Sequence, residues 1–257
     1  MNQKIALITG ATAGIGLETA TLLAKNNFDL ILTGRRNDRL QAIKTNLENS
    51  FGSKVLILNF DIRIKKDTED ALNSIPEEWR SIDVLLNNAG LASGLAPINS
   101  AEVDDWETMI DTNIKGLLYT SRIVTPWMIK RKCGHIINIS SIAGREAYPN
   151  GSVYCGTKHA VNAISKAMRI ELLPYNIKVT TIAPGAVETE FSLVRFHGDQ
   201  EKADLVYKGF SPLQANDIAE TIWFVITRPT HVNIDDLLIM PTNQASARDF
   251  YKELKET

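Results

Sequence analysis

The sequence contains few of the residues that build metal centres and disulfide frameworks. Among its 257 residues there are two cysteines and four histidines. The cysteines, Cys133 and Cys155, lie far apart and form neither a disulfide framework nor a zinc-ligand pattern. We therefore expect no metal site, and we expect both thiols to be buried as small apolar groups in a reducing compartment.

A large excess of charge and a long apolar run are also missing. The 28 basic residues are nearly balanced by 30 acidic residues, which leaves a net charge of −2. This balance gives no electrostatic reason to expect nucleic acid or an anionic membrane as a partner. No apolar run approaches the roughly 20 residues of a membrane-spanning helix, and the first residues show no cleavable secretory signal. We expect a soluble, cytoplasmic protein.

Strand-like and helix-like segments alternate along the whole chain. Apolar runs typical of parallel strands buried on both faces occupy residues 5–9, 28–33, 55–60, 82–86, 135–139, 178–182 and 237–240. Helical patterns occupy residues 15–25, 39–47, 65–73, 100–131, 152–173 and 216–227. This alternation predicts an α/β architecture, in which a seven-stranded parallel sheet carries helices on both faces.

We predict a single domain over residues 1–257, because no linker, repeat or low-complexity tract divides the chain. The most polar long insertion covers residues 188–209, late in the chain. We predict that this segment is a lid over a substrate site rather than a boundary between domains.

The first strand-to-helix turn is rich in glycine, with Gly10, Gly14 and Gly16 inside Thr9–Gly16. Glycine permits positive φ in a tight turn and lets the backbone approach a pyrophosphate closely. The helix that follows would point its free N–H groups at that anion. We predict that Gly10, Thr12, Gly14, Ile15 and Gly16 bind a dinucleotide.

The residues after the second strand bear on the choice of cofactor. Sites specific for NAD place a carboxylate there to accept from the ribose 2′-hydroxyl. This sequence instead has Arg35 and Arg36, whose guanidinium groups could hold a 2′-phosphate. The alternative is that both are surface residues at a helix N-terminus with no ligand to bind, although a helix N-terminus is an unfavourable place for cations. We predict NADP as the cofactor, bound by Arg35 and Arg36, with Arg35 the stronger candidate of the two.

Tyr154 and Lys158 lie four positions apart in a helical segment, so they share one helix face. A nearby ammonium favours the phenolate form of a tyrosine, whose ordinary pKa is about 10. Ser141 follows the fifth strand, at the edge where doubly wound sheets place their sites. We predict that Ser141 holds a substrate oxygen while Tyr154 transfers its proton.

Several motifs follow one another over nearly the whole chain: Thr9–Gly16, Asn87–Gly90, Asn113, Ile139–Ser141, Tyr154 with Lys158, and Pro184–Gly185. Together they resemble the short-chain dehydrogenase/reductase family. The resemblance implies a single-domain doubly wound Rossmann fold and a homotetramer. It also implies that the serine at position 141, not the neighbouring Ser140, is catalytic.

The resemblance implies further site residues. Asn113 would hold a water for a proton relay through Lys158, which would also bind the nicotinamide ribose. Contacts to the adenosine half would come from Asp61 and from the stretch Asn87–Gly90, with Asn87, Ala89 and Gly90 as the named contacts. Contacts to the nicotinamide end would come from Pro184, Gly185, Val187 and Thr189.

Residues 188–196 and 241–246 resemble a subgroup of this family, the NADP-dependent 3-hydroxy acid dehydrogenases, also described as serine 3-dehydrogenases. The resemblance implies oxidation of serine, L-allo-threonine and related 3-hydroxy acids, or reduction of short 3-oxo acids. A small acid needs a cation in its pocket, and Arg195 could supply one. Arg195 could equally be a solvated lid residue or a subunit contact, in which case Arg145 is the next candidate.

Two other functions remain open at this point. A 3-oxoacyl carrier-protein reductase would need a basic docking patch near the site entrance, which Arg122, Lys130, Arg131 and Lys132 could form, although a solvated helix end explains them equally well. A non-catalytic NADP-binding sensor would use the same fold. Such a sensor would be expected to lack a catalytic residue, whereas Asn113, Ser141, Tyr154 and Lys158 are all present.

Overall fold

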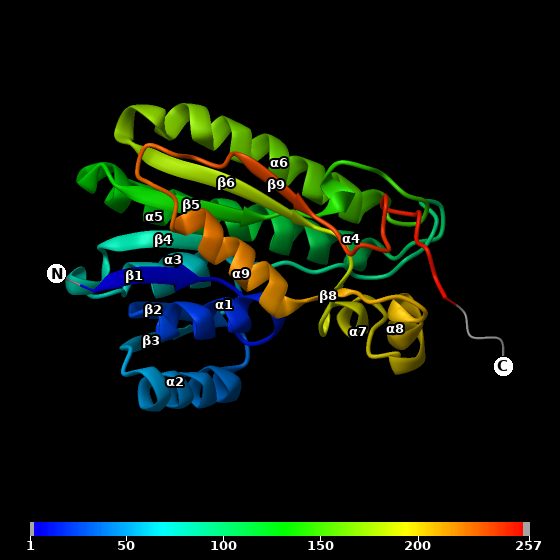
Figure 1. Ribbon diagram of the computed structural model, residues 1–257, viewed down its shortest axis with the longest axis horizontal. Helices are drawn as coiled ribbons and strands as arrows, with labels where there is room; N and C mark the ends of the chain where they lie inside the picture. The colour runs from blue at the N-terminus through cyan, green and yellow to red at the C-terminus, as the bar shows by residue number, and fades with distance from the viewer. Residues whose placement is uncertain (1–2, 254–257) are drawn as a thin grey trace.

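The computed structural model describes residues 3–253 and has one large sheet at its centre (Figure 1). Its seven strands are β1 (Lys4–Ile8), β2 (Phe28–Gly34), β3 (Val55–Asn59), β4 (Ile82–Asn87), β5 (Gly134–Ile139), β6 (Ile177–Pro184) and β9 (Asp236–Ile239). They lie in the order β3-β2-β1-β4-β5-β6-β9, and each neighbouring pair is parallel. The predicted fold class is confirmed, and each predicted strand ends within a residue or two of the observed one.

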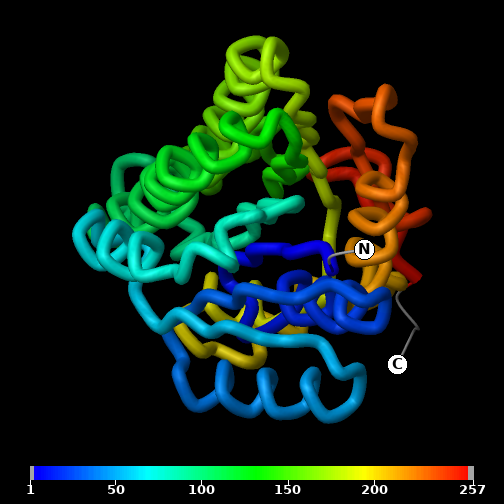
Figure 2. The backbone as a smooth tube through the Cα atoms, turned by 90° about the vertical axis from the view of Figure 1, so that its left-hand side faces the viewer, coloured from blue at the N-terminus to red at the C-terminus, as the bar shows by residue number. Residues whose placement is uncertain are grey.

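Helices cover both faces of this sheet (Figures 1 and 2). They are α1 (Gly14–Lys25), α2 (Asn37–Phe51), α3 (Lys65–Asn73), α4 (Val103–Ile110), α5 (Leu117–Arg131), α6 (Ser152–Leu172) and α9 (Ala215–Ile226). Side chains of α1, α2 and α9 share one apolar cluster with the sheet, and side chains of α3, α5 and α6 share the other. In β1, Ile8 packs into the first cluster and Leu7 into the second, which explains the uninterrupted apolar run.

The sequence predicts one or more helical segments within residues 100–131, and the structure has two, the first of which starts later than predicted. The helix begins at Val103, and the Ser100 backbone N–H donates to Pro97 in a preceding turn. Between α4 and α5 the chain forms a π-helical turn, Asp111–Gly116. Such turns often mark functional positions, and this one carries Asn113, which is buried.

The 188–209 segment folds into two short helices, α7 (Phe191–Arg195) and α8 (Gln200–Tyr207), at one end of the sheet (Figure 1). It is flanked by a short parallel pair, β7 (Val187–Glu188) and β8 (Leu213–Gln214), which the sequence pattern did not predict. The hydroxyl of Tyr207 donates to the Val187 carbonyl at 2.9 Å and so ties α8 to β7. That this segment acts as a lid remains a prediction.

The expectation that both thiols are buried is wrong for Cys133. Cys155 is buried in α6, but Cys133 is exposed in the turn between α5 and β5. Lys132, in left-handed conformation, ends α5 and turns the chain at the surface. Among residues 3–253, no helix combines the length and the apolar character that crossing a membrane would require.

The core contains a titratable histidine side chain that is buried in the sheet. His135 in β5 is 4% exposed, and its Nε2 lies 2.8 Å from the Thr180 hydroxyl. Burial lowers the pKa of His135 to about 3, with a smaller contribution from the Lys178 ammonium. Since the unfolded chain has the ordinary value of about 6.5, the unfolded state binds a proton between pH 6.5 and 3 that the folded state does not.

We therefore expect His135 to make the free energy of unfolding fall as pH drops from 6.5, by up to about 1.4 kcal/mol per pH unit. Urea unfolding of His135→Gln at pH 7, 6 and 5 should show a shallower pH dependence than the wild type. His231→Gln is the control, because His231 is exposed. Equal slopes in wild type and His135→Gln would contradict the buried neutral state.

Candidate active site

A cavity of about 340 Å³ opens beyond the carboxyl ends of the strands. Its wall includes the turns after β1, β2, β4, β5 and β6. The strand order reverses at β1 and β4, and doubly wound sheets bind their ligands at that switch point. The position of this cavity is therefore set by the topology of the sheet.

The glycine-rich turn after β1 forms one wall of the cavity. Gly10 and Gly14 have φ of +66° and +52°, which side chains rarely tolerate. A Cβ on Gly10 would lie 2.9 Å from the Ala89 Cα, so the turn also packs closely against the chain after β4. Helix α1 begins at Gly14 without a side-chain cap, which leaves its first N–H groups free for an anion. This turn fits a pyrophosphate.

Gly16 was predicted to bind the cofactor, but the structure gives it a packing role. A Cβ there would lie 2.5 Å from the Gly10 carbonyl oxygen and 2.6 Å from Asn88 Nδ2. The residues that line the cavity here are Gly10, Thr12, Ala13, Gly14 and Ile15. Gly16 thus allows the turn to close, and its contact with the cofactor remains a prediction.

The chain after β4 is held against the same turn. The backbone N–H groups of Asn88 and Ala89 both donate to the Thr9 hydroxyl at 3.0 Å. Asn88, Ala89 and Gly90 line the cavity. The Asn87 side chain is buried and donates to Ser121 at 3.0 Å and Asn138 at 2.8 Å, so it fastens β4 to its neighbours. These bonds give Asn87 a structural role, and its contact with the cofactor remains a prediction.

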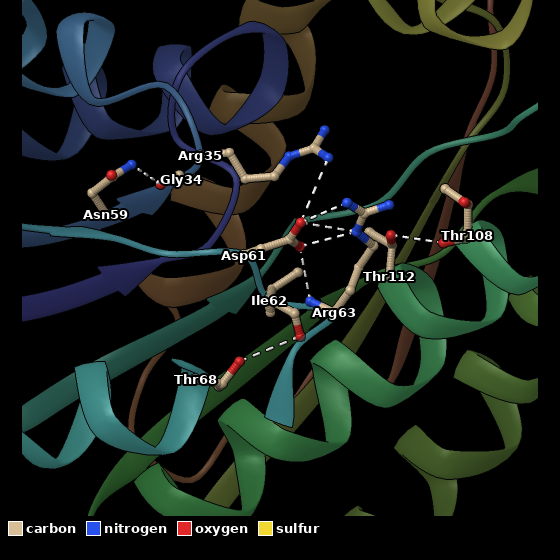
Figure 3. Close-up of polar contacts among 9 residues, drawn as sticks. All are labelled: Gly34, Arg35, Asn59, Asp61, Ile62, Arg63, Thr68, Thr108 and Thr112. Carbon is tan, nitrogen blue, oxygen red and sulfur yellow. Dashed lines mark hydrogen bonds and ion pairs between the residues drawn. The ribbon is translucent and has the colours of Figure 1, made fainter. Parts of the chain in front are cut away.

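Charged groups gather at the carboxyl ends of β2 and β3 (Figure 3). The Arg35 guanidinium is 55% exposed and lies 3.9 Å from the Asp61 carboxylate. Asp61 also accepts bonds of 2.6–3.0 Å from the side chain of Arg63, which the sequence did not single out. Burial opposes the ionisation of Asp61, but the Arg63 bonds outweigh it and hold the pKa of Asp61 below its usual value. The carboxylate is therefore anionic and fixed.

The Arg36 guanidinium is more constrained than that of Arg35. Its Nε and Nη2 donate to the Thr12 hydroxyl at 3.0 and 2.7 Å, and its Nη1 donates to Glu190 at 2.7 Å. Both arginines line the cavity. Arg35 therefore keeps more donors available for a phosphate than Arg36 does.

Ser141 and Ser140 have different surroundings at the end of β5. The Ser140 hydroxyl donates to the Lys158 carbonyl at 3.3 Å and is thus committed to α6. The Ser141 hydroxyl accepts from the Ala143 N–H at 3.1 Å and donates to the Pro184 carbonyl at 3.4 Å. Both serines line the cavity, but Ser141 also interacts with Tyr154, so it is the better placed of the two to hold a substrate oxygen.

Lys158 extends through the core of the site. Its Nζ donates to the Ile139 carbonyl at 3.0 Å and lies 5.9 Å from the centre of the Tyr154 ring. Burial lowers the pKa of Lys158 to about 8. A Cβ on Gly90 would lie 3.3 Å from this Nζ, so glycine at position 90 leaves room for the ammonium.

Tyr154 is buried between two cations. Burial raises the pKa of Tyr154, and Tyr148 adds to that effect, whereas Arg195 and a hydrogen bond with Ser141 oppose it. The Arg195 Cζ lies 5.0 Å from the centre of the Tyr154 ring. The net effect of these groups is a pKa above the usual value, so the surroundings favour the neutral phenol, the form of Tyr154 that can donate a proton.

Asn113 lies in the π-helical turn, with its side chain fully engaged. Its Oδ1 accepts from the Leu91 N–H at 2.8 Å, and its Nδ2 donates to the Leu91 carbonyl and to Thr157. These bonds hold the chain after β4 against α6. The water relay that the resemblance implies remains a prediction. In the structure, the Asn113 side-chain amide already binds Leu91 and Thr157.

Four of the remaining predicted residues line the cavity, whereas Arg195 and Arg145 are not among its lining residues. Pro184, Gly185, Val187 and Thr189 line the cavity, and the Gln244 side chain accepts from the Ala186 N–H at 2.8 Å to brace their turn. Arg195 Nη2 donates to the Tyr148 hydroxyl at 2.7 Å. Arg145 pairs with Asp236 at 2.6 Å. Sequence reasoning did not single out Glu190, Phe191 or Val194, which also line the cavity.

A comparison with protein families decides the broader identity of the chain. Residues 4–199 match the model of the short chain dehydrogenase family. This match covers well over half of the 257 residues. The chain belongs to the short-chain dehydrogenase family.

Relatives within the short-chain dehydrogenase family align over nearly the whole chain. The NADP-dependent 3-hydroxy acid dehydrogenase of Salmonella typhi is 49% identical, covering 95% of this chain and 97% of the relative. The protein of the same name from Schizosaccharomyces pombe is 44% identical, covering 98% of each. A closed form of serine dehydrogenase complexed with NADP+ has a TM-score of 0.90 at 45% identity, covering 97% of this chain and 100% of the other.

Family membership confirms an oxidoreductase and agrees with the convergence of groups in the cavity. In this short-chain dehydrogenase, the three groups suited to proton transfer come from two parts of the chain. Ser141 follows β5, while Tyr154 and Lys158 share one face of α6. The glycine-rich turn and Arg35 line the same cavity. The fold thus brings a dinucleotide cradle and an acid–base group to one place.

Proposed function

We propose that this chain is an NADP-dependent dehydrogenase that interconverts a short 3-hydroxy acid, such as serine, L-allo-threonine or 3-hydroxypropionate, and its 3-oxo acid. One observation carries the proposal: Ser141, Tyr154 and Lys158 line the same cavity as Arg35 and the glycine-rich turn. The identity to named 3-hydroxy acid dehydrogenases and the NADP+ complex of a serine dehydrogenase support the choice of cofactor and substrate.

The proposed residue roles follow from chemistry. Bound NADP supplies the hydride acceptor at its nicotinamide ring. The Ser141 hydroxyl orients the substrate oxygen, and Tyr154 removes the hydroxyl proton during oxidation or returns it during reduction. The Lys158 ammonium, held by the Ile139 carbonyl, stabilises the Tyr154 phenolate that forms. The buried surroundings strengthen these electrostatic effects by excluding water.

The substrate carboxylate requires a cation, and we propose Arg195 for this role. Its guanidinium stacks beside Tyr154, and among residues 3–253 no acceptor reaches its buried Nε. A buried donor without a partner is costly, so an anion that reaches it would be stabilised. Arg145 is the weaker candidate, because Asp236 already neutralises it.

Arg195→Met should raise KM for serine or L-allo-threonine by about tenfold to a hundredfold, as expected for loss of one charge-assisted contact. The KM for an uncharged secondary alcohol should change far less. Steady-state kinetics with both substrates measures the difference, with Arg145→Met as the matched control. If acid and neutral substrates suffer equally, Arg195 supports the Tyr154 ring and does not bind the carboxylate.

The carrier-protein reductase alternative loses support from the position of its basic patch. Arg131 Nη1 donates to the carbonyl of Ile82, and its Nη2 pairs with Asp83, at the start of β4. Arg131, and with it the adjoining Lys130 and Lys132, therefore lies at the amino ends of the strands, whereas the cavity opens at their carboxyl ends. Steady NADPH oxidation with a carbonyl substrate would exclude the non-catalytic sensor.

We further propose that the enzyme is a cytoplasmic homotetramer, by analogy with its family. The free thiols Cys133 and Cys155 suit a reducing compartment. Ile170 and Leu173, at the end of α6, are 74% and 71% exposed and could be covered by another subunit. Light scattering coupled to size-exclusion chromatography would give the mass of the assembly.

The proposed function is tested with a panel of 3-hydroxy acids, 2-hydroxy acids, 3-hydroxyacyl thioesters and neutral alcohols, each with NADP+ and with NAD+. The absorbance of the reduced cofactor reports turnover. We expect the highest kcat/KM for a short 3-hydroxy acid with NADP+. A preference for neutral alcohols, for thioesters or for NAD+ would contradict the proposal.

A further inference from the structure

The Glu190 carboxylate joins the start of α7 to the start of α2. Its Oε2 accepts from Arg36 and its Oε1 from Arg39, both at 2.7 Å. We call these three residues the arginine clasp. Arg36 caps α2 and Arg39 lies in its first turn, where the helix dipole disfavours cations. Glu190 supplies an anion that compensates for this placement.

The sheet topology shows what the arginine clasp crosses. Arg36 follows β2, whereas Glu190 follows β6 and the short β7. Between β2 and β6 the sheet holds β1, β4 and β5, so the two strands are roughly 19 Å apart at the usual strand spacing. The connected segments must therefore arch over the carboxyl ends of β1 and β4, where the dinucleotide crevice lies.

The members of the arginine clasp differ in their access to the crevice. Among residues 3–253, those that line the cavity include Arg36 and Glu190 but not Arg39. Arg36 also donates two hydrogen bonds to the Thr12 hydroxyl, which belongs to the glycine-rich turn. Arg39 thus holds Glu190 from outside, and its removal would alter the clasp without removing a cavity-lining side chain.

We propose that Glu190 and Arg39 are positioning residues for the cofactor, which close the arginine clasp over the dinucleotide and must part before it leaves. The inference rests on the proposed use of NADP. The side chains of Arg36, Arg39 and Glu190 are 40%, 44% and 42% exposed, so each pair is weak and can open readily. The clasp slows the release of the cofactor without sealing the site.

The test is the rate of NADPH release, measured by stopped-flow fluorescence when excess NADP+ displaces NADPH from the enzyme. We expect Glu190→Gln and Arg39→Gln each to accelerate release by about two- to fivefold, the range that an exposed ion pair supports. Glu188→Gln is the matched control, because Glu188 contacts Gln214 instead of an arginine. Raising the salt concentration should reduce the difference between wild type and Glu190→Gln.

The outcomes separate this inference from the proposed function. Failure of the wild type to bind NADPH more tightly than NADH would contradict the proposed cofactor. With tight NADPH binding in the wild type, unchanged release from both Glu190→Gln and Arg39→Gln would overturn the clasp. Equal acceleration in Glu188→Gln would also overturn it, because the effect would then follow from any loss of negative charge on this segment.

Discussion

Replacing Tyr154 with phenylalanine should lower kcat by about 10²–10⁴-fold, the range typical for loss of a general acid–base group. The hydroxyl transfers the proton, and phenylalanine has none. The ring should remain in place, because it packs against Phe191 at 5.7 Å between centroids and beneath Arg195 at 5.0 Å. NADPH affinity should stay nearly unchanged, since the glycine-rich turn and Arg35 hold the other half of the cofactor.

Turnover with serine or L-allo-threonine, together with a fluorescence titration of NADPH, measures both parts of the Tyr154 prediction. Tyr175→Phe is the control, because Tyr175 lies at the surface beyond α6 and is 37% exposed. A Tyr154→Phe variant that keeps more than about a tenth of wild-type turnover would contradict the assignment of Tyr154 as the acid–base group.

Replacing Arg35 with aspartate should shift the ratio of NADP to NAD affinity by about tenfold to a hundredfold, which corresponds to one lost charge-assisted contact. A carboxylate repels a 2′-phosphate and can accept from a 2′-hydroxyl. The structure favours Arg35 over Arg36, because Thr12 and Glu190 already occupy three nitrogens of Arg36. The Asp61 carboxylate lies 3.9 Å from the Arg35 guanidinium, which is too far for a bidentate hydrogen-bonded pair.

Dissociation constants for NADPH and NADH, measured by fluorescence for each variant, test the Arg35 prediction. Lys66→Asp provides the same charge reversal on the surface of α3, where the Lys66 side chain is 81% exposed. An unchanged ratio in Arg35→Asp would show that another residue holds the 2′-phosphate. Arg36→Asp would then be the next variant to measure.

The sequence predicted the features that depend on short-range patterns. The strands form apolar runs because both faces of a parallel sheet are covered, so their positions can be read without a structure. The glycine-rich turn and the Tyr154–Lys158 pair are also local, since helical spacing alone places Tyr154 and Lys158 on one face. The position of the cavity at the carboxyl ends of the strands follows from the fold class.

The features that the sequence did not predict depend on contacts between distant segments. The Arg36–Glu190 pair joins residues 154 positions apart, and no periodicity reports such a pair. Asn87 and Asn88 look alike in the sequence, but strand alternation turns Asn87 into the core and leaves Asn88 at the cavity. The π-helical turn at Asn113 departs from the helical period, so a regular pattern over residues 100–131 concealed it.

The most direct test of the central claim follows the hydrogen that leaves the substrate. Serine deuterated at carbon 3 is oxidised with NADP+, and the mass of the reduced cofactor is measured. Oxidation of a 3-hydroxy acid by hydride transfer predicts NADPH that carries one deuterium from carbon 3, and unlabelled NADPH when the deuterium is instead at carbon 2. Deuterium transfer from carbon 2, or no reduction of NADP+ by serine or any other 3-hydroxy acid, would contradict the account.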